Sequence, residues 1–429
     1  MSVSHRNPQT PPTAKDDAPA NDATQTTIRR NALRSRPSSH GQVGGLAGAL
    51  ATLPGVRTHR YAREGWFVAS VGALLLLTVF ALSALGNGLA NAAQGAQTQQ
   101  AGAAPTVASG GATNGVSVTA AHEQAYHLPQ TNPGVMYPAV DAQGNVWFGE
   151  MGENALARLD PRTGAVQSWT PPNGHYNIMG VAIDAQGNVW FAEQAGNYIG
   201  RFDPQTQTFT TYPLADKKAT PQDIVFDAQG RLWFDETVAG RIGRLDPTTG
   251  AIQTWPLPDD SATTPAYLYG LALAADGSVW YGTLSGLVGR LDPATGQVTQ
   301  HHLASAKTEV FAMASDAQGR IWFTELFGGK LGVINTTTGQ LAELAVPTTL
   351  GDPGGLYGVT VAPDGSVWFA SAGANALVRY IPTTGAYTFF QLSIPNSVPY
   401  GVALDTSSDG VHLWFTADGQ PNYVGVMNA

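Results

Sequence analysis

Short apolar runs separated by polar turns recur along the chain from about residue 135 to residue 429. Each repeat is marked by a tryptophan followed directly by phenylalanine or tyrosine. The seven copies are Trp147-Phe148, Trp190-Phe191, Trp233-Phe234, Trp280-Tyr281, Trp322-Phe323, Trp368-Phe369 and Trp414-Phe415. They lie 42 to 47 residues apart, and a period of this length is typical of a repeat architecture.

Each repeat divides into four short predicted strands. An Asp-x-x-Gly or Asp-Gly turn precedes most of the tryptophans, as at residues 184–187, and an Ile-Gly-Arg-like segment follows. A second turn, such as Asp-Pro-Thr-Thr-Gly at 246–250, leads into an alternating segment rich in Thr and Gln. Four strands in each of seven repeats predict an all-β fold, a seven-bladed β-propeller over residues 121–429.

The ring of blades is expected to close with a strand from its other end. The seventh repeat reaches Ala429 after three strands, the third being 423–427. Residues 122–128 resemble a fourth strand and precede Pro129, as other fourth strands precede or end in proline. We therefore predict that this N-terminal strand completes the last blade, which removes an exposed sheet edge.

A different pattern precedes the repeats. Residues 1–65 are rich in Pro, Ala, Thr, Ser and Arg and poor in aromatic residues, which is typical of a disordered tail. Residues 66–86 are apolar and uncharged, and the run is long enough for one transmembrane helix. Residues 87–120 are dominated by Ala, Gly, Gln and Thr, which predicts a flexible linker.

Charge predicts the orientation of this span. Arg57, Arg60 and Arg63 precede the apolar run, and no charged residue follows the run until Glu123. The positive-inside rule then puts the tail in the cytoplasm and the propeller outside, as a single-pass membrane protein. In the alternative, the run is a signal peptide cleaved after Ala92, and the propeller is secreted.

Composition excludes several classes of protein. The chain has no cysteine, so disulfides and thiolate metal sites are excluded. Residues 1–65 hold nine Lys and Arg against four Asp and Glu, while the remainder holds 13 against 27. Such an acidic body repels phosphate backbones, so we expect no nucleic-acid partner.

Strand polarity places the variable residues around the mouth of the channel, where first strands begin and second strands end. The strand-opening residues are Tyr137, Met179, Gln222, Tyr269, Phe311, Tyr357 and Tyr400. The carboxylates three residues past a tryptophan are Glu150, Glu193, Glu236 and Glu325. These four could ring a shallow funnel and hold a cation or a polar ligand. In the alternative, each accepts hydrogen bonds from its own loop or from the arginine of its blade.

Two further groups are candidates for ligand binding. Gln222, Asp223, Asp235 and Glu236 are expected to come close together in the third blade, and Tyr269, Tyr357 and Tyr400 to form an aromatic arc. Glu236, Asp223 and Asp418 are candidate ligands for Mg²⁺ or Ca²⁺. His175, in the loop before the second blade, is a candidate general base, although a lone loop histidine is more often simply exposed.

The repeats resemble those of the virginiamycin B lyase (streptogramin lyase) family. The resemblance covers residues 122–429 and is clear in the segment 180–193, Gly-Val-Ala-Ile-Asp-Ala-Gln-Gly-Asn-Val-Trp-Phe-Ala-Glu, with Ile-Gly-Arg at 199–201. It implies a seven-bladed propeller. It also implies a magnesium-assisted elimination that opens a cyclic antibiotic at its ester linkage, with histidine as the general base.

The positions that the resemblance assigns to this chemistry carry other residues here. Where the family has Pro-His-Ala and Glu-Pro-His-Gly in its last two blades, this chain has Tyr357 and Tyr400 in place of the histidines and Val398 in place of the acid. Only Asp418 could stand for a carboxylate that follows the last Trp-Phe. Tyrosine, with a pKa near 10, is a poor base at neutral pH.

We therefore expect a membrane-anchored, extracytoplasmic propeller that binds a small molecule or a cell-surface protein and has lost the lyase residues. Two alternatives stay open. One is a metal-dependent lyase or hydrolase that uses the acidic funnel. The other is a protein-interaction scaffold, since propellers carry many unrelated functions.

Overall fold

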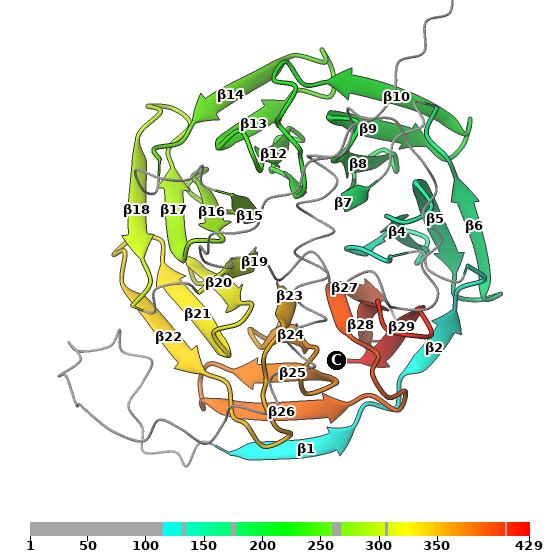
Figure 1. Cartoon of the computed structure of the whole chain (residues 1–429), viewed down its shortest axis with the longest axis vertical. Coiled ribbons are helices and arrows are strands. Elements are labelled where there is room, and N and C mark those ends of the chain that lie inside the picture. Colours follow the sequence, from blue (N-terminus) through cyan, green and yellow to red (C-terminus); the bar gives the residue numbers. More distant parts are fainter. Residues whose placement is uncertain (1–114, 131–133, 173–176, 260–266, 305–307, 408–409) are drawn as a thin grey trace, which may run out of the picture. The chain divides into compact units, whose positions relative to one another are not determined.

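The computed structural model describes residues 115–130, 134–172, 177–259, 267–304, 308–407 and 410–429. Every element in this part of the chain is a β-strand, and the strands form seven sheets that follow one another in a ring (Figure 1). The predicted all-β, seven-bladed propeller is confirmed. The predicted tail (1–65), span (66–86) and most of the predicted linker lie outside the described residues, among which no helix could cross a membrane.

In each blade, the strands are ordered from the centre of the ring to its rim, the first strand being innermost. Blade 1 consists of β3 (Ala139–Val140), β4 (Val146–Glu150), β5 (Ala155–Asp160) and β6 (Ala165–Trp169). Blade 2 consists of β7 (Ile178–Ile183), β8 (Val189–Glu193), β9 (Tyr198–Asp203) and β10 (Thr208–Pro213). Blade 3 consists of β11 (Ile224–Phe226), β12 (Leu232–Glu236), β13 (Arg241–Leu245) and β14 (Ile252–Pro256). Blades 4 and 5 are β15 (Leu268–Leu273), β16 (Val279–Thr283), β17 (Leu287–Leu291), β18 (Val298–His302); and β19 (Val310–Ser315), β20 (Arg320–Glu325), β21 (Lys330–Asn335), β22 (Leu341–Ala345). Blade 6 is β23 (Leu356–Val361), β24 (Val367–Ser371), β25 (Ala376–Ile381), β26 (Ala386–Gln391) and β1 (Val116–Ala120); blade 7 is β27 (Pro399–Ser407), β28 (Gly410–Ala417), β29 (Tyr423–Asn428) and β2 (Gln124–His127).

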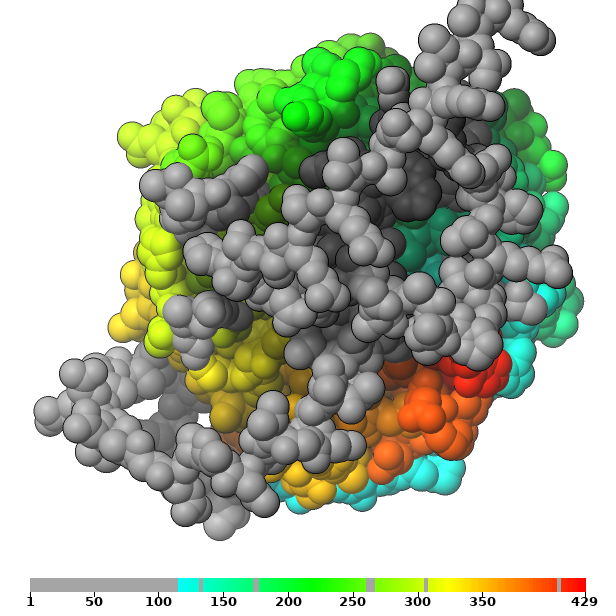
Figure 2. Space-filling view, viewed as in Figure 1, coloured from blue at the N-terminus to red at the C-terminus, as the bar shows by residue number. Residues whose placement is uncertain are grey.

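The second strand of each blade forms the core between blades. Successive side chains of a strand point to opposite faces, so Trp190 packs with residues of blade 3 and Phe191 with residues of blade 1. The Trp and the aromatic residue after it are almost completely buried in every blade. The blades take the same order in the space-filling view, from blade 1 in green-blue to blade 7 in red (Figure 2).

The glycine of the Ile-Gly-Arg segment is required by this packing. The ring of Phe191 lies across Gly200, and a Cβ at Gly200 would overlap the ring. Gly243 under Phe234 and Gly332 under Phe323 repeat the arrangement. Glycine thus lies opposite the aromatic residue in blades 2, 3, 4, 5 and 7, whereas Ala157 and Val378 take this place in blades 1 and 6.

An aspartate fixes the turn before the tryptophan in blades 1, 2, 3 and 5. In blade 2, Asp184 accepts hydrogen bonds from the backbone N–H groups of Gln186 (3.0 Å) and Asn188 (2.8 Å) and from the indole Nε1–H of Trp190 (2.8 Å). The same carboxylate thus satisfies the turn and the buried indole, which explains the spacing between Asp and Trp in the repeat.

The tryptophan also stacks on the outer strand. Trp190 lies 5.3 Å from Tyr212 between ring centroids, and the guanidinium of Arg201 lies 6.0 Å from its ring. Arg158 and Arg244 sit over tryptophans in the same way. Arg158, Arg201 and Arg244 therefore contact indole rings, and in the alternative in which each glutamate is held by its own loop or its blade's arginine, these three are not the arginines that do so.

The predicted closure of the ring is confirmed. Strand β2 pairs antiparallel with β29, from Gln124 opposite Val426 to His127 opposite Tyr423. Tyr126 of β2 stacks on Trp414 at 6.0 Å, where other blades use a residue of their own fourth strand. Because β27 also contacts β3, the last blade meets the first.

The end of the predicted linker is a strand, which corrects the linker boundary of 87–120. Residues 116–120 form β1, which pairs in parallel with β26 as a fifth strand of blade 6. Three of the five residues, Val116, Val118 and Thr119, are β-branched, a type enriched in strands, and Ser117 Oγ donates a hydrogen bond to Thr388 Oγ1 at 3.0 Å. The Ala- and Gly-rich composition of residues 87–120 gave no indication of this short strand.

Deletion of the N-terminal strands tests the closure. A 116–429 fragment keeps both strands, a 121–429 fragment loses β1, and a 129–429 fragment loses β2 as well. Each lost ladder hydrogen bond costs about 0.5–1.5 kcal/mol net, and the loss of β2 also uncovers Trp414. We expect a small fall in melting temperature for 121–429 and a large fall, or aggregation, for 129–429. Equal melting temperatures for 116–429 and 129–429 would contradict the closure.

Substitution of Asp184 tests the turn. Asp184→Ala leaves the Trp190 indole and two backbone donors without their acceptor, at about 1–3 kcal/mol for each donor that stays buried. Asp246→Ala is the matched control, because Asp246 caps an exposed turn through Thr248 N at 2.8 Å. Urea unfolding should show a loss for Asp184→Ala at least twice that of the control, and a smaller difference would argue against the role of the aspartate.

Candidate functional site

The first strands begin and the second strands end at one face of the propeller, which we call the loop face. Backbone hydrogen bonds join the two positions blade by blade. The N–H of Gln194 donates to Asn177 O (3.0 Å), that of Leu326 to Glu309 O (2.8 Å), and that of Asp418 to Val398 O (3.1 Å). The predicted neighbourhood of strand openers and second-strand ends is therefore present.

Five strand-opening aromatic side chains meet at the centre of this face. Phe311 is the hub, with centroid distances of 5.2 Å to Tyr357, 5.3 Å to Tyr269, 5.6 Å to Tyr400 and 6.4 Å to Tyr137. Tyr357 and Tyr400 lie 4.7 Å apart. We call these five residues the central aromatic cluster; it contains the predicted arc, joined through Phe311, which sequence reasoning had left out of the site.

The tyrosines of the cluster stay protonated at neutral pH. Burial raises the pKa of Tyr269 and of Tyr357 to about 12. Burial also raises the pKa of Tyr137 and of Tyr400 well above 10. The nearness of other tyrosines and of further acidic groups raises both pKa values more. Their hydroxyl groups can donate hydrogen bonds, but they cannot serve as bases near pH 7.

Asp223, Asp235 and Gln222 come together in blade 3 as predicted. The Asp235 carboxylate accepts the backbone N–H groups of Gln222 and Asp223, both at 2.8 Å, and the Thr237 hydroxyl at 3.0 Å. Asp223 accepts the N–H of Leu271 in blade 4 at 2.9 Å. Burial raises the pKa of Asp223 to about 6 and that of Asp235 to about 7, the latter helped by the charge of Asp223.

Glu236 does not join this group. Its carboxylate accepts Nε–H of Arg241, and the guanidinium of Arg241 also pairs with Asp216 at 2.8 Å. Glu236 follows Asp235 directly in β12, so the two side chains point to opposite faces of the blade. The expected close group of four polar side chains is thus a group of three.

The predicted funnel of four carboxylates is not formed. Glu150, Glu193, Glu236 and Glu325 are all buried within their blades. Glu193 accepts the N–H of Gly196 in its own hairpin, and burial raises its pKa to about 8. Burial and the nearby charge of Glu343 raise the pKa of Glu325 to about 8. These side chains share the phase of the buried phenylalanine two positions earlier, so they point into the blade.

Two acids lie beside the central aromatic cluster. Asp418 accepts Nδ2–H of Asn422 at 3.1 Å, and burial raises its pKa to about 6. Its charge raises the pKa of Tyr357 and of Tyr400. Glu309, which sequence reasoning missed, affects Tyr269 and Tyr357 in the same way, and burial raises its own pKa. Its place two residues before the strand-opening Phe311 was the available signal.

The remaining candidates are a histidine base and a metal site. His175 lies outside the described residues. Among the residues that the structure describes, no three His, Asp or Glu side chains gather into a group that could hold a metal ion. Asp223, Glu236 and Asp418 therefore do not form such a group.

Comparison with known proteins supports the fold and the family. The virginiamycin B lyase family model matches residues 105–379 and 261–429. A solved virginiamycin B lyase from Staphylococcus aureus is 24% identical over 72% of this chain and 99% of its own, with a TM-score of 0.64. A streptogramin B lyase structure is 25% identical over 72% of this chain and 98% of its own, also at 0.64. No curated protein matches.

More distant propellers share the fold alone. YCF48, solved with a D1 peptide bound, is 16% identical over 72% of this chain and 95% of its own, with a TM-score of 0.55. The family match covers the whole propeller, with the Trp-Phe and Ile-Gly-Arg elements that build it. The chain belongs to the virginiamycin B lyase family.

Proposed function

We propose that this protein is a ligand-binding propeller that holds its ligand on the loop face, over the central aromatic cluster, and lacks the lyase reaction of its family. One observation carries the proposal. Tyr357 and Tyr400, in ring contact at the centre of the site, stand where the family resemblance implies histidines. Their raised pKa values remove the base that the elimination requires.

A relative supports the separation of binding from reaction. A catalytically inactive histidine-to-alanine variant of the S. aureus virginiamycin B lyase was solved with quinupristin. That protein is 24% identical to this chain over 72% of it. A propeller of this type with one histidine replaced by alanine, and without activity, can therefore still be found with its ligand.

The magnesium ion that the family reaction implies does not fit the residues present. Val398 offers no side-chain oxygen at the position of the implied acid, and the carboxylate of Asp418 already accepts a hydrogen bond from Asn422. Hard cations prefer several oxygen ligands at once. The residues present therefore do not form the implied magnesium site.

The chemistry of the cluster favours a partly apolar ligand with hydrogen-bond acceptors. Aromatic rings supply flat apolar area, and protonated tyrosine hydroxyls supply donors at its edge. Tyr137 and Tyr269 are half-buried, whereas Phe311, Tyr357 and Tyr400 are buried. The first two rings would thus contact the ligand, and the other three would hold them in place.

We further propose that the propeller works outside the cytoplasm on a membrane anchor. The support is the uncharged apolar run 66–86, with arginines before it and no charged residue after it until Glu123. Cleavage after Ala92 would instead release the propeller. Extracellular domains of two-component systems from B. thetaiotaomicron share the fold, one at 19% identity and a TM-score of 0.56 over 72% of this chain and 43% of its own.

Quinupristin tests binding and reaction together. The full chain with quinupristin and Mg²⁺ should show calorimetric binding, while mass analysis should show ring opening no faster than without protein. Tyr269→Ala should weaken binding at least fivefold, because a half-buried ring contact is lost. Thr248→Ala, at the opposite face, is the control and should bind as the parent does.

Two results would contradict this proposal. Ring opening at an enzyme-like rate would show that the lyase reaction survives without the histidines. Unchanged binding by Tyr269→Ala, with its fold intact by circular dichroism, would move the ligand away from the central aromatic cluster.

A further inference from the structure

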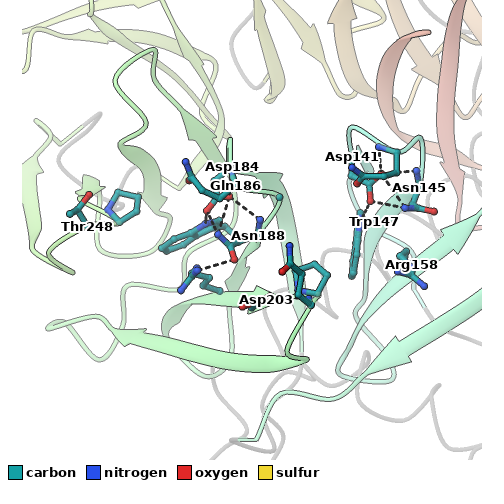
Figure 3. A pocket seen from close by; sticks show the side chains of 16 residues that line it. Asp141, Asn145, Trp147, Arg158, Asp184, Gln186, Asn188, Asp203 and Thr248 are labelled. Atoms are coloured by element: carbon teal, nitrogen blue, oxygen red, sulfur yellow. Dashed lines mark hydrogen bonds between the residues drawn. The ribbon is translucent and has the colours of Figure 1, made fainter. Parts of the chain in front are cut away.

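A polar groove lies at the other face of the propeller, where the first and second strands are joined by turns. We call it the turn face. The groove has a volume of about 730 Å³ and is lined by the turns of blades 1 and 2, with Pro247 and Thr248 from blade 3 (Figure 3). It lies at the opposite ends of the strands from the central aromatic cluster, so it is independent of the function proposed above.

Two identical segments face this groove. Residues 141–147 and 184–190 both read Asp-Ala-Gln-Gly-Asn-Val-Trp. Asp141, like Asp184, is fully engaged by its own turn: it accepts the N–H groups of Gln143 and Asn145, both at 2.9 Å, and Nε1–H of Trp147 at 2.9 Å. The other polar groups that line the groove include the guanidinium groups of Arg158 and Arg201, the amides of glutamines and the carboxylate of Asp203.

Blades 4 and 6 show what the equivalent arginine binds when it can. Arg290 pairs with Asp276 at 3.0 Å, and Arg379 with Asp364 at 2.5 Å. Both arginines belong to the third strand, as Arg158 and Arg201 do. The aspartate of these two blades comes from the turn before the tryptophan, so the position beside the guanidinium holds a carboxylate.

Blades 1 and 2 place amide oxygens, not a carboxylate, against that guanidinium: Nη2 of Arg158 lies 3.5 Å from Gln167 Oε1, and Arg201 donates to Asn188 Oδ1 at 2.8 Å. Their turn aspartates point to the indole instead, and no ion pair of Arg158 or Arg201 is found within the described residues. Nε of Arg158 is buried without a hydrogen-bond partner. Asp203, near Arg201, caps its own turn through Gln205 N at 2.8 Å.

In blades 3 and 5, the residue two positions before the tryptophan is an arginine. Where blades 1 and 2 have Asn145 and Asn188, these blades have Arg231 and Arg320, which pair with Asp227 at 2.7 Å and Asp316 at 2.6 Å. The combination of an unpaired third-strand arginine and an amide beside it occurs in blades 1 and 2, which are neighbours in the ring. The two half-sites thus share one groove.

We propose that this groove binds an acidic peptide segment, with Arg158 and Arg201 each taking one carboxylate. A guanidinium binds a carboxylate through two parallel hydrogen bonds. Gln143, Gln186 and Gln205 line the groove and can pair with peptide N–H and C=O groups, since an amide side chain both donates and accepts. Trp147 and Trp190 are each 1% exposed, so the groove offers no open aromatic face for a sugar ring.

The probe is a fluorescent hexaglutamate peptide, titrated into the full chain at low salt. Hexaglutamine and an oligogalacturonate are tested in parallel for how tightly they bind. The parent should bind hexaglutamate, and Arg158→Gln/Arg201→Gln should weaken binding at least tenfold. Arg290→Gln is the matched control, because its partner is Asp276 within the blade, and it should bind as the parent does. Added salt should weaken binding, since the contacts are ionic.

Arg158 packs against Trp147 and Trp169, so its substitution can disturb the fold as well as the groove. A second variant therefore tests the groove without changing this packing. Gln143→Ala/Gln186→Ala changes only exposed side chains and should weaken binding about threefold. The proposal is overturned by no binding of hexaglutamate, or by unchanged binding in the folded double-arginine variant. Hexaglutamine or oligogalacturonate binding as tightly as hexaglutamate would also overturn it, because charge or peptide chemistry would then not select the ligand.

Discussion

Packing of the second-strand Trp and Phe between adjacent blades is the contact on which the rest of this propeller depends. One ring faces each neighbouring blade, as Trp190 and Phe191 do, so every blade is held from both sides. The Asp that binds the indole and the Gly beneath the phenylalanine are consequences of this arrangement. The buried Trp-aromatic pair is present in all seven blades, whereas the aspartate serves blades 1, 2, 3 and 5 and the glycine serves blades 2, 3, 4, 5 and 7.

Residues outside this framework are free to differ, and both candidate sites are built from them. On the loop face, the strand-opening position varies from Met179 to Phe311 and Tyr400, and five such aromatic residues meet at the centre. On the turn face, the residue two before the tryptophan is Asn in blades 1 and 2 and Arg in blades 3 and 5. This single difference decides whether the turn aspartate has an internal cation.

Much of the fold could be predicted because repetition shows it. Seven Trp-aromatic pairs give the blades, and a missing fourth strand gives the closure through residues 122–128. Strand β1 was not predicted, because its five residues are too few to stand out in an Ala- and Gly-rich segment.

The candidate site was predicted only in part. Glu150 and its equivalents were placed at the mouth by their position along the strand, but the alternation of side chains turns them into the blade. The aromatic arc was found from strand openers alone. The role of Phe311 as its hub, and the nearness of Glu309, depend on ring packing across blades, which a sequence does not display.

The central claim is that the two tyrosines at the implied histidine positions, Tyr357 and Tyr400, stay protonated at neutral pH and so cannot replace histidine as a base. The most direct test is an NMR titration of tyrosine ring carbons in the labelled full chain, with the four cluster tyrosines assigned by substitution to Phe. The account predicts that Tyr269 and Tyr357 titrate near pH 12 and that Tyr137 and Tyr400 titrate well above the ordinary value. A cluster tyrosine that ionises clearly below about pH 10, the ordinary value, would contradict it.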